Sequence, residues 1–226
     1  MQPLRYATHA FRLYPLILGV AIPEAQYATE DIDLAQFQEI SVALDDKVDP
    51  KIQEALAQVG KLTPAASLYQ SQPTGYRVAD TLVEILTPNR GTDREESVEL
   101  PALGVHAKPL RFLDFLLAEA MPACVPYRSG VLVNVPQPAR YAVHKLIVST
   151  RRIQIAAAKA RKDIEQAMAL IRVLAQDQPD ELARAYHEAS DRGEQWRRAL
   201  TRGANRMTRE AQEMLDQTLA EADADA

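Results

Sequence analysis

Residues 29–34 read Thr-Glu-Asp-Ile-Asp-Leu, and this stretch decides how the rest of the chain is interpreted because it has the pattern of a β-strand. Alternate residues of a strand point to opposite faces, so Asp31 and Asp33 share one face and lie roughly 6 to 7 Å apart along the strand. Ile32 and Leu34 point the other way, toward an apolar core. The carboxylate face therefore offers the hard oxygen ligands that Mg²⁺ prefers.

The pair of aspartates could also arise by chance. The chain has 15 Asp among 226 residues, so a random order would contain about one Asp-x-Asp. A second such pair, Asp223 and Asp225, lies near the end of the sequence. The alternative to a metal site is a solvated pair on an edge strand. The metal interpretation therefore depends on what the other strands contribute.

Composition indicates a globular protein. Hydrophobic residues make up 47% of a 25.1 kDa chain, which is sufficient for a substantial core. The longest apolar run, residues 13–22, is interrupted by Pro15 and Gly19 and is far shorter than the ~20 residues of a membrane span. Because no signal-peptide pattern is clear either, we expect a cytoplasmic protein without a membrane segment.

Zinc binding is not expected. Cys124, the single cysteine, excludes an intrachain disulfide and a multi-cysteine zinc site, and we expect it to be a small buried residue. The four histidines lack the i, i+4 spacing of a helical metal site. The net charge of −5 disfavours tight nonspecific binding to duplex nucleic acid.

The first part of the chain alternates between strand and helix patterns. These patterns predict a strand at 3–7, a helix from Thr8 to Leu18, the Asp31/Asp33 strand, a short helix at 50–59, and a hairpin of 76–79 with 82–87 that Pro88 ends.

The later part changes to helices. The patterns predict short strands at 98–100 and 131–135 with a helix at 110–117 between them, and helices from residue 138 onward. We therefore predict an α+β fold of α/β type, in which a mixed sheet with flanking helices is followed by a C-terminal helical region. The predicted domains are 1–136 and 137–226.

Glu84 is the third candidate carboxylate. Strand alternation places it on one face with Leu82 and Leu86, where a charge needs a partner or a metal ion. The alternative is a salt bridge to Arg77 across the predicted hairpin. A two-metal site requires more: Asp31, Asp33 and Glu84 must approach a common point to within about 4 to 7 Å on adjacent strands.

The order of these segments resembles the nucleotidyltransferase-fold superfamily of DNA polymerase beta, in particular bacterial proteins related to the AbiEii and minimal nucleotidyltransferase groups. The matching segments are 7–11 for the Gly-Ser or Gly-Thr turn, 29–34 for the Asp-x-Asp strand, 83–88 for the strand of the third carboxylate, and 109–116 and 138–146 farther along. The sequence departs from the family at Ala7, which stands where the family has glycine.

The resemblance implies transfer of a nucleoside monophosphate from an NTP to an acceptor hydroxyl of RNA, a protein or a small molecule. Two Mg²⁺ ions would be held by Asp31, Asp33 and Glu84, the catalytic carboxylates. Thr8 would bind the triphosphate, and Arg140 and Lys145 would contribute positive charge to nucleotide binding.

Structural alternatives remain open for these residues. Thr8 would equally serve as a helix N-cap, and Lys145 would equally be a surface residue of its helix. The alternative function is a catalytically degenerate member that acts as a nucleotide-binding or toxin–antitoxin-like interaction module.

Overall fold

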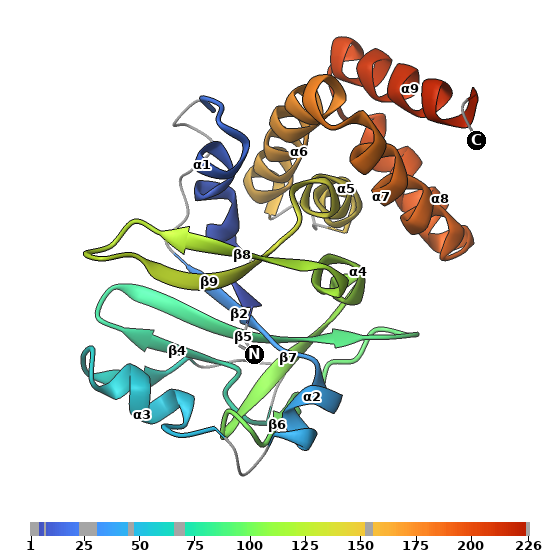
Figure 1. The fold of residues 1–226 in the computed structure, drawn as a ribbon. Helices are drawn as coiled ribbons and strands as arrows, with labels where there is room; N and C mark the ends of the chain where they lie inside the picture. Colours follow the sequence, from blue (N-terminus) through green and yellow to red (C-terminus); the bar gives the residue numbers. More distant parts are fainter. Residues whose placement is uncertain are drawn as a thin grey trace. The chain divides into compact units, whose positions relative to one another are not determined.

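The computed structural model describes residues 5–6, 8–22, 31–44, 48–65, 71–151 and 156–224, with side chains from residue 9 onward. It divides into two compact units. The first comprises Met1–Leu13 and Ala28–Pro136, and the second comprises Tyr14–Tyr27 and Gln137–Ala226 (Figure 1). Ala7 and the first two residues of the 29–34 stretch lie outside the described residues.

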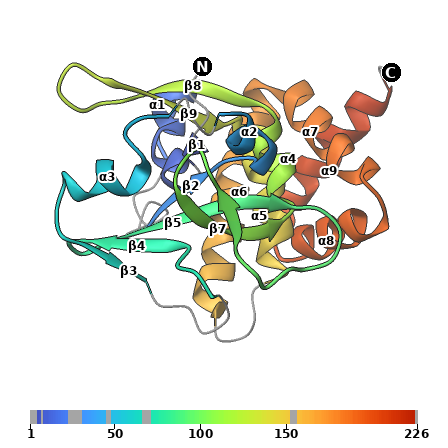
Figure 2. The ribbon, with the colours of Figure 1, turned by 90° about the horizontal axis from the view of Figure 1, so that it is seen from below.

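The first unit contains the strands. Their bounds are β1 (Arg5–Tyr6), β2 (Ile32–Ala35), β3 (Leu62–Pro64), β4 (Gly75–Val78), β5 (Thr81–Asn89), β6 (Val98–Leu100), β7 (Val105–Arg111), β8 (Ala120–Val125) and β9 (Val131–Pro136). One sheet has the order β1-β2-β5-β4-β3, which can be followed in Figure 2, and β7 joins it on β5 while β6 pairs with β7. Strands β8 and β9 form a separate two-stranded sheet.

The large sheet is mixed. Strand β5 is parallel to both β2 and β7, whereas the pairs β1–β2, β3–β4, β4–β5 and β6–β7 are antiparallel. Parallel neighbours need a long crossover, and the chain between β2 and β5 provides one. The predicted hairpin is confirmed as β4–β5.

Short helices accompany this sheet. They are η1 (Thr8–Arg12), α2 (Gln38–Ala43), α3 (Ile52–Ala57) and α4 (Leu113–Ala118). Apolar side chains of β2, β4, β5 and β7 form a core with Ile52 and Leu56 of α3. We call this side of the sheet the core face. The predicted α+β fold with a mixed sheet and flanking helices is confirmed.

Two boundaries differ from the sequence prediction because prolines lie inside strands. Pro88 does not end β5, which continues to Asn89. The helix predicted at 110–117 begins at Leu113, because β7 runs through Pro109 to Arg111. Each proline lies where one neighbouring pairing has ended, so the missing N–H removes no ladder bond there.

The second unit is helical. Its helices are α1 (Tyr14–Leu18), α5 (Pro138–Ser149), α6 (Ala157–Asp177), α7 (Pro179–Asp191), α8 (Glu194–Ala204) and α9 (Arg209–Ala224). Pro138 and Pro179 occupy first-turn positions, where the absent N–H costs no helical hydrogen bond. Gly19, with φ +68°, ends α1.

Helix α5 is the centre of the second unit, and most of its side chains are buried. It packs against α6, α7 and α8 (Figure 1). Tyr14 of α1 makes an edge-to-face contact with Tyr141 of α5, with ring centroids 5.2 Å apart. Burial, together with the nearby Tyr141 hydroxyl, raises the pKa of Tyr14 well above its usual value.

None of the described helices combines the length and the hydrophobicity that crossing a membrane requires. Cys124 of β8 is exposed, so the expectation that it is buried was wrong. Its position on a two-stranded sheet explains the exposure, because neighbouring side chains on its face, Pro122 and Leu132, are exposed as well.

Candidate active site

Asp33 and Glu84 are direct neighbours on two parallel strands. The register of β2 and β5 pairs Asp33 with Glu84, between the pairs Ile32–Val83 and Leu34–Ile85. Laterally paired residues of a sheet point to the same side, and neighbouring strands lie about 4.8 Å apart. Both side chains are partly exposed. The backbone therefore presents two carboxylates side by side toward solvent.

The opposite side of the same two strands is apolar, as the sequence predicts. Leu34, Val83 and Ile85 belong to the buried core, and Ile32 packs against it. This burial fixes the register, because a shift of one residue would turn both carboxylates into the core. We call the other side, which carries Asp33 and Glu84, the carboxylate face.

Asp31 immediately precedes β2 and is partly exposed. Across the described parts of the chain, no group of three or more His, Cys, Asp or Glu side chains is arranged to hold a metal ion. The register thus brings two of the three predicted carboxylates together, and the side chains of all three do not meet at one point in this structure.

Glu84 does not form the alternative salt bridge to Arg77. In the β4–β5 hairpin, Gly75 lies opposite Glu84 and Arg77 lies opposite Leu82. The Arg77 guanidinium donates to the carbonyl oxygen of Asp80 at 3.3 Å, and among the described residues no ion pair joins it to Glu84. An ion pair with Arg77 on the hairpin therefore does not account for the charge of Glu84 on this face.

The predicted triphosphate turn follows β1. Thr8 begins the short helix η1, and this helix contacts β2, the strand of Asp33. The side chain of Thr8 is outside the described residues, and its backbone forms the first residue of η1. That location agrees with a turn adjacent to the carboxylates.

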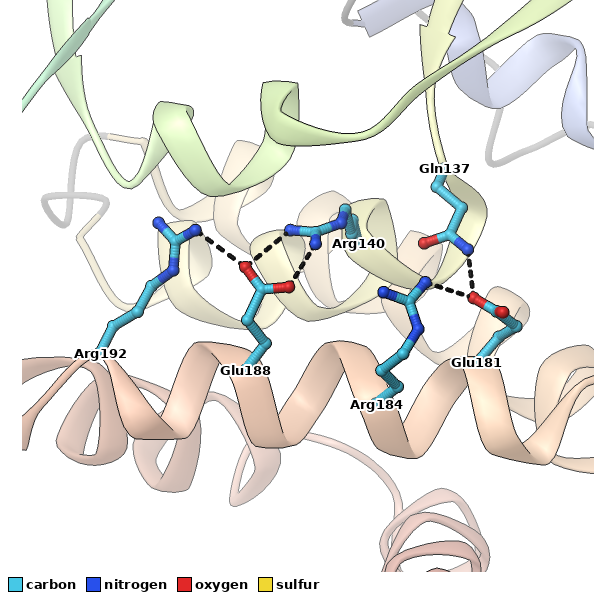
Figure 3. A network of polar contacts seen from close by, with 6 residues as sticks. All are labelled: Gln137, Arg140, Glu181, Arg184, Glu188 and Arg192. Atoms are coloured by element: carbon cyan, nitrogen blue, oxygen red, sulfur yellow. Dashed lines mark hydrogen bonds and ion pairs between the residues drawn. The ribbon is translucent and has the colours of Figure 1, made fainter.

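Arg140 has an acidic partner within the second unit (Figure 3). Its guanidinium is 2% exposed and makes a bidentate contact with Glu188 of α7, whose carboxylate also accepts from Arg192 at 2.9 Å. Burial by itself raises the pKa of Glu188, but the hydrogen bonds from Arg140 and Arg192 outweigh it and lower the pKa overall. Next to this group, Glu181 of α7 accepts from Gln137 and Arg184.

Lys145 is also engaged. Its ammonium donates to Asp163 of α6 at 2.7 Å and lies 5.1 Å from the centroid of the Tyr141 ring. The hydroxyl of Tyr141 in turn donates to Gln166 at 3.1 Å. Lys145 and Asp163 are nearly buried, with side chains 13% and 4% exposed. This ion pair links α5 to α6, so Lys145 has a structural role of its own.

One charged residue of the carboxylate face was not singled out by the sequence. Strand β7 pairs Lys108 with Leu86 of β5, two residues beyond Glu84. Alternation along β7 places Val105 and Ala107 in the core and Lys108 on the other side. The alternating apolar and polar residues from 105 to 108 are the signal that would have revealed this strand.

The family described as Nucleotidyltransferase matches residues 7–191, which include both the carboxylate strands and helices α5 to α7. The chain belongs to this nucleotidyltransferase family. Membership supports nucleotidyl transfer as the general activity, with an NTP as substrate, and members of the family generally use divalent metal ions.

A comparison with solved structures finds an antigenic nucleotidyltransferase-like protein from Paracoccidioides brasiliensis. It is 15% identical, with coverage of 88% of this chain and 84% of that one, and the TM-score is 0.35. A likeness at this level carries no argument about the site. No curated protein sequence matches this chain.

Proposed function

We propose that this protein is a Mg²⁺-dependent nucleotidyltransferase that transfers a nucleoside monophosphate from an NTP to an acceptor hydroxyl. The observation that carries the proposal is the lateral pairing of Asp33 with Glu84 on the face opposite the core. Like charges on laterally paired residues of a sheet repel each other, and a cation bound beside Asp33 and Glu84 would offset that repulsion. Because the chain belongs to a nucleotidyltransferase family, we interpret this carboxylate pair as part of a nucleotidyl-transfer site.

Asp33 and Glu84 fit a magnesium site in their chemistry and in their backbone register. Carboxylate oxygens are the ligands that Mg²⁺ takes from proteins, alongside water and substrate phosphates. Asp33 and Glu84 would hold the metal, and Asp31 would complete the set for two ions. Two Mg²⁺ ions, when bound, would neutralise the charge that develops on the phosphates and lower the pKa of the acceptor hydroxyl.

The protein residues would orient the metal site, accept a proton and contact the phosphates. Asp33 and Glu84 would orient the site from adjacent strands, and Glu84 would accept the proton of the acceptor hydroxyl. Thr8, at the start of η1, would contact the triphosphate. Arg140 and Lys145 stay proposed nucleotide contacts, although a phosphate would have to compete there with the carboxylates of Glu188 and Asp163.

A catalytically degenerate member is the second candidate. Two observations favour it: the described residues contain no three-carboxylate metal group, and Ala7 replaces a glycine of the family turn. Such a protein would bind nucleotide or a protein partner without transfer, as a toxin–antitoxin-like module in the cytoplasm. Transfer activity separates the two candidates directly.

The test is a transfer assay on the full chain. Purified protein would be incubated with Mg²⁺ and each α-labelled NTP, in the presence of RNA and protein acceptors, and incorporation of label would be measured. We expect Asp33→Asn and Glu84→Gln to lower the rate by about 100-fold or more, because each removes a charge that stabilises the transition state.

The chain offers matched controls for both variants. Asp80→Asn changes an exposed turn, and Glu99→Gln changes an exposed residue of β6. Both should leave the rate within a few-fold of the wild type. If the wild type incorporates label no faster than the Asp33→Asn variant with any NTP and acceptor, the enzymatic proposal fails and the degenerate candidate is favoured.

A further inference from the structure

The carboxylate face also carries a lysine, Lys108, whose role no other observation explains. Lys108 lies on β7, between Ala107 of the core and the buried Pro109. Its side chain is exposed, and among the described residues it has no acidic partner. Lys51 of the same unit differs, because its ammonium donates to the carbonyl oxygens of Pro101 and Ala102.

The strand register places Lys108 close to the carboxylate pair. Lys108 lies beside Leu86 of β5, and Leu86 lies two residues after Glu84 on the same face. With about 4.8 Å between strands and about 6.6 Å along two residues, the Cα atoms of Lys108 and Glu84 are about 8 Å apart. A flexible four-carbon stem lets the ammonium reach the space in front of the carboxylates.

Two acidic residues lie diagonally from Lys108 on neighbouring strands, and neither forms an ion pair with it. Glu84 is on β5, and Glu99 lies opposite His106 on β6. The described residues include no ion pair between Lys108 and either carboxylate. The ammonium of Lys108 can therefore pair with an anion that binds on this face.

We propose that Lys108 binds the triphosphate of the NTP substrate. The proposal rests on the proposed function, because it assigns the substrate of the same face. A triphosphate that approaches Asp33 and Glu84 meets negative charge, and an ammonium beside them offsets part of that repulsion. Arg77 is less suited to this role, since its guanidinium already donates to the Asp80 carbonyl.

The experiment measures binding by isothermal titration calorimetry on the full chain. The probes are inorganic tripolyphosphate and a non-hydrolysable ATP analogue, each with Mg²⁺ at low ionic strength. We expect Lys108→Met to weaken both at least about 10-fold, and Lys108→Arg, which keeps the charge, to retain most of the affinity. Lys61→Met is the matched control, because Lys61 is an exposed lysine just before β3.

The outcomes separate this inference from the proposed function. If tripolyphosphate binds in a Lys108-dependent way but no acceptor is labelled, the transferase proposal fails and the phosphate site stands. If the wild type transfers nucleotides while Lys108→Met binds both probes as tightly as wild type, the inference is overturned. It is also overturned if Lys61→Met weakens binding equally, or if the wild type binds neither probe.

Discussion

At the scale of single residues, the sequence predicts which face of the strand carries Asp33, but not which residues lie beside the predicted site residues. Strand alternation alone places Asp33 opposite the core, and the structure confirms this through the burial of Leu34. The lateral contact with Glu84 depends on pairing between strands some fifty residues apart, which no local pattern encodes. The partners of Arg140 and Lys145 were missed for the same reason, since Glu188 and Asp163 come from other helices.

The Glu188 carboxylate gives a prediction at this scale. Its pKa is lowered from 4.5 in the folded chain, so its contribution to stability is present above that value and is lost as the pH falls through the lowered pKa. The free energy of unfolding should therefore be higher for wild type than for Glu188→Gln at pH 7. This difference should shrink steadily below pH 4.5.

Urea unfolding of both proteins at several pH values between 7 and 3 measures this difference. The substitution also leaves the buried guanidinium of Arg140 without its carboxylate, which adds to the loss at neutral pH. A difference that is the same at both ends of the range would show that the ion pair to Arg140 does not lower the pKa of Glu188.

At the scale of elements, helices were predicted better than strands. Helical periodicity continues over α6, α7, α8 and α9, and capping signals such as Pro179 mark where helices begin. Strand β8 was not predicted, and Pro122 lies inside it. A two-stranded sheet leaves each strand with a free edge, where proline is tolerated.

The contact between α5 and α8 gives a second prediction. A Cβ atom on Gly203 of α8 would overlap the carbonyl of Leu146 on α5, with the carbonyl carbon only 2.7 Å away. In an open helix, Gly→Ala would stabilise by roughly 0.5–1 kcal/mol. We expect Gly203→Ala to destabilise the chain by about 2 kcal/mol instead, because backbone atoms have to move.

Urea unfolding of the full chain measures this effect, with Gly60→Ala as the control. A Cβ atom at Gly60 would meet Val78 Cγ1 at 3.4 Å, an ordinary contact. The control should change stability by less than about 1 kcal/mol. Equal stability of Gly203→Ala and wild type would mean that α5 and α8 do not approach each other as closely as described.

At the scale of the whole molecule, the sequence predicts an α+β chain followed by helices, and the structure confirms this order. The order of segments also pointed to the family, which the match over residues 7–191 shows. The pairing of β5 with β2, β4 and β7 could not be predicted from the sequence, because strand order depends on long-range packing. That topology is what gathers Asp33, Glu84 and Lys108 on one face.

The most direct measurement is Mn²⁺ binding by electron paramagnetic resonance, with Mn²⁺ in place of Mg²⁺ and a non-hydrolysable NTP present. It needs no knowledge of the acceptor. We predict bound Mn²⁺ in the wild type, binding weakened at least about 10-fold in Asp33→Asn and Glu84→Gln, and unchanged binding in Asp80→Asn and Glu99→Gln. Equal Mn²⁺ affinity in wild type and in the Asp33→Asn and Glu84→Gln variants would contradict a divalent-metal site on the carboxylate face.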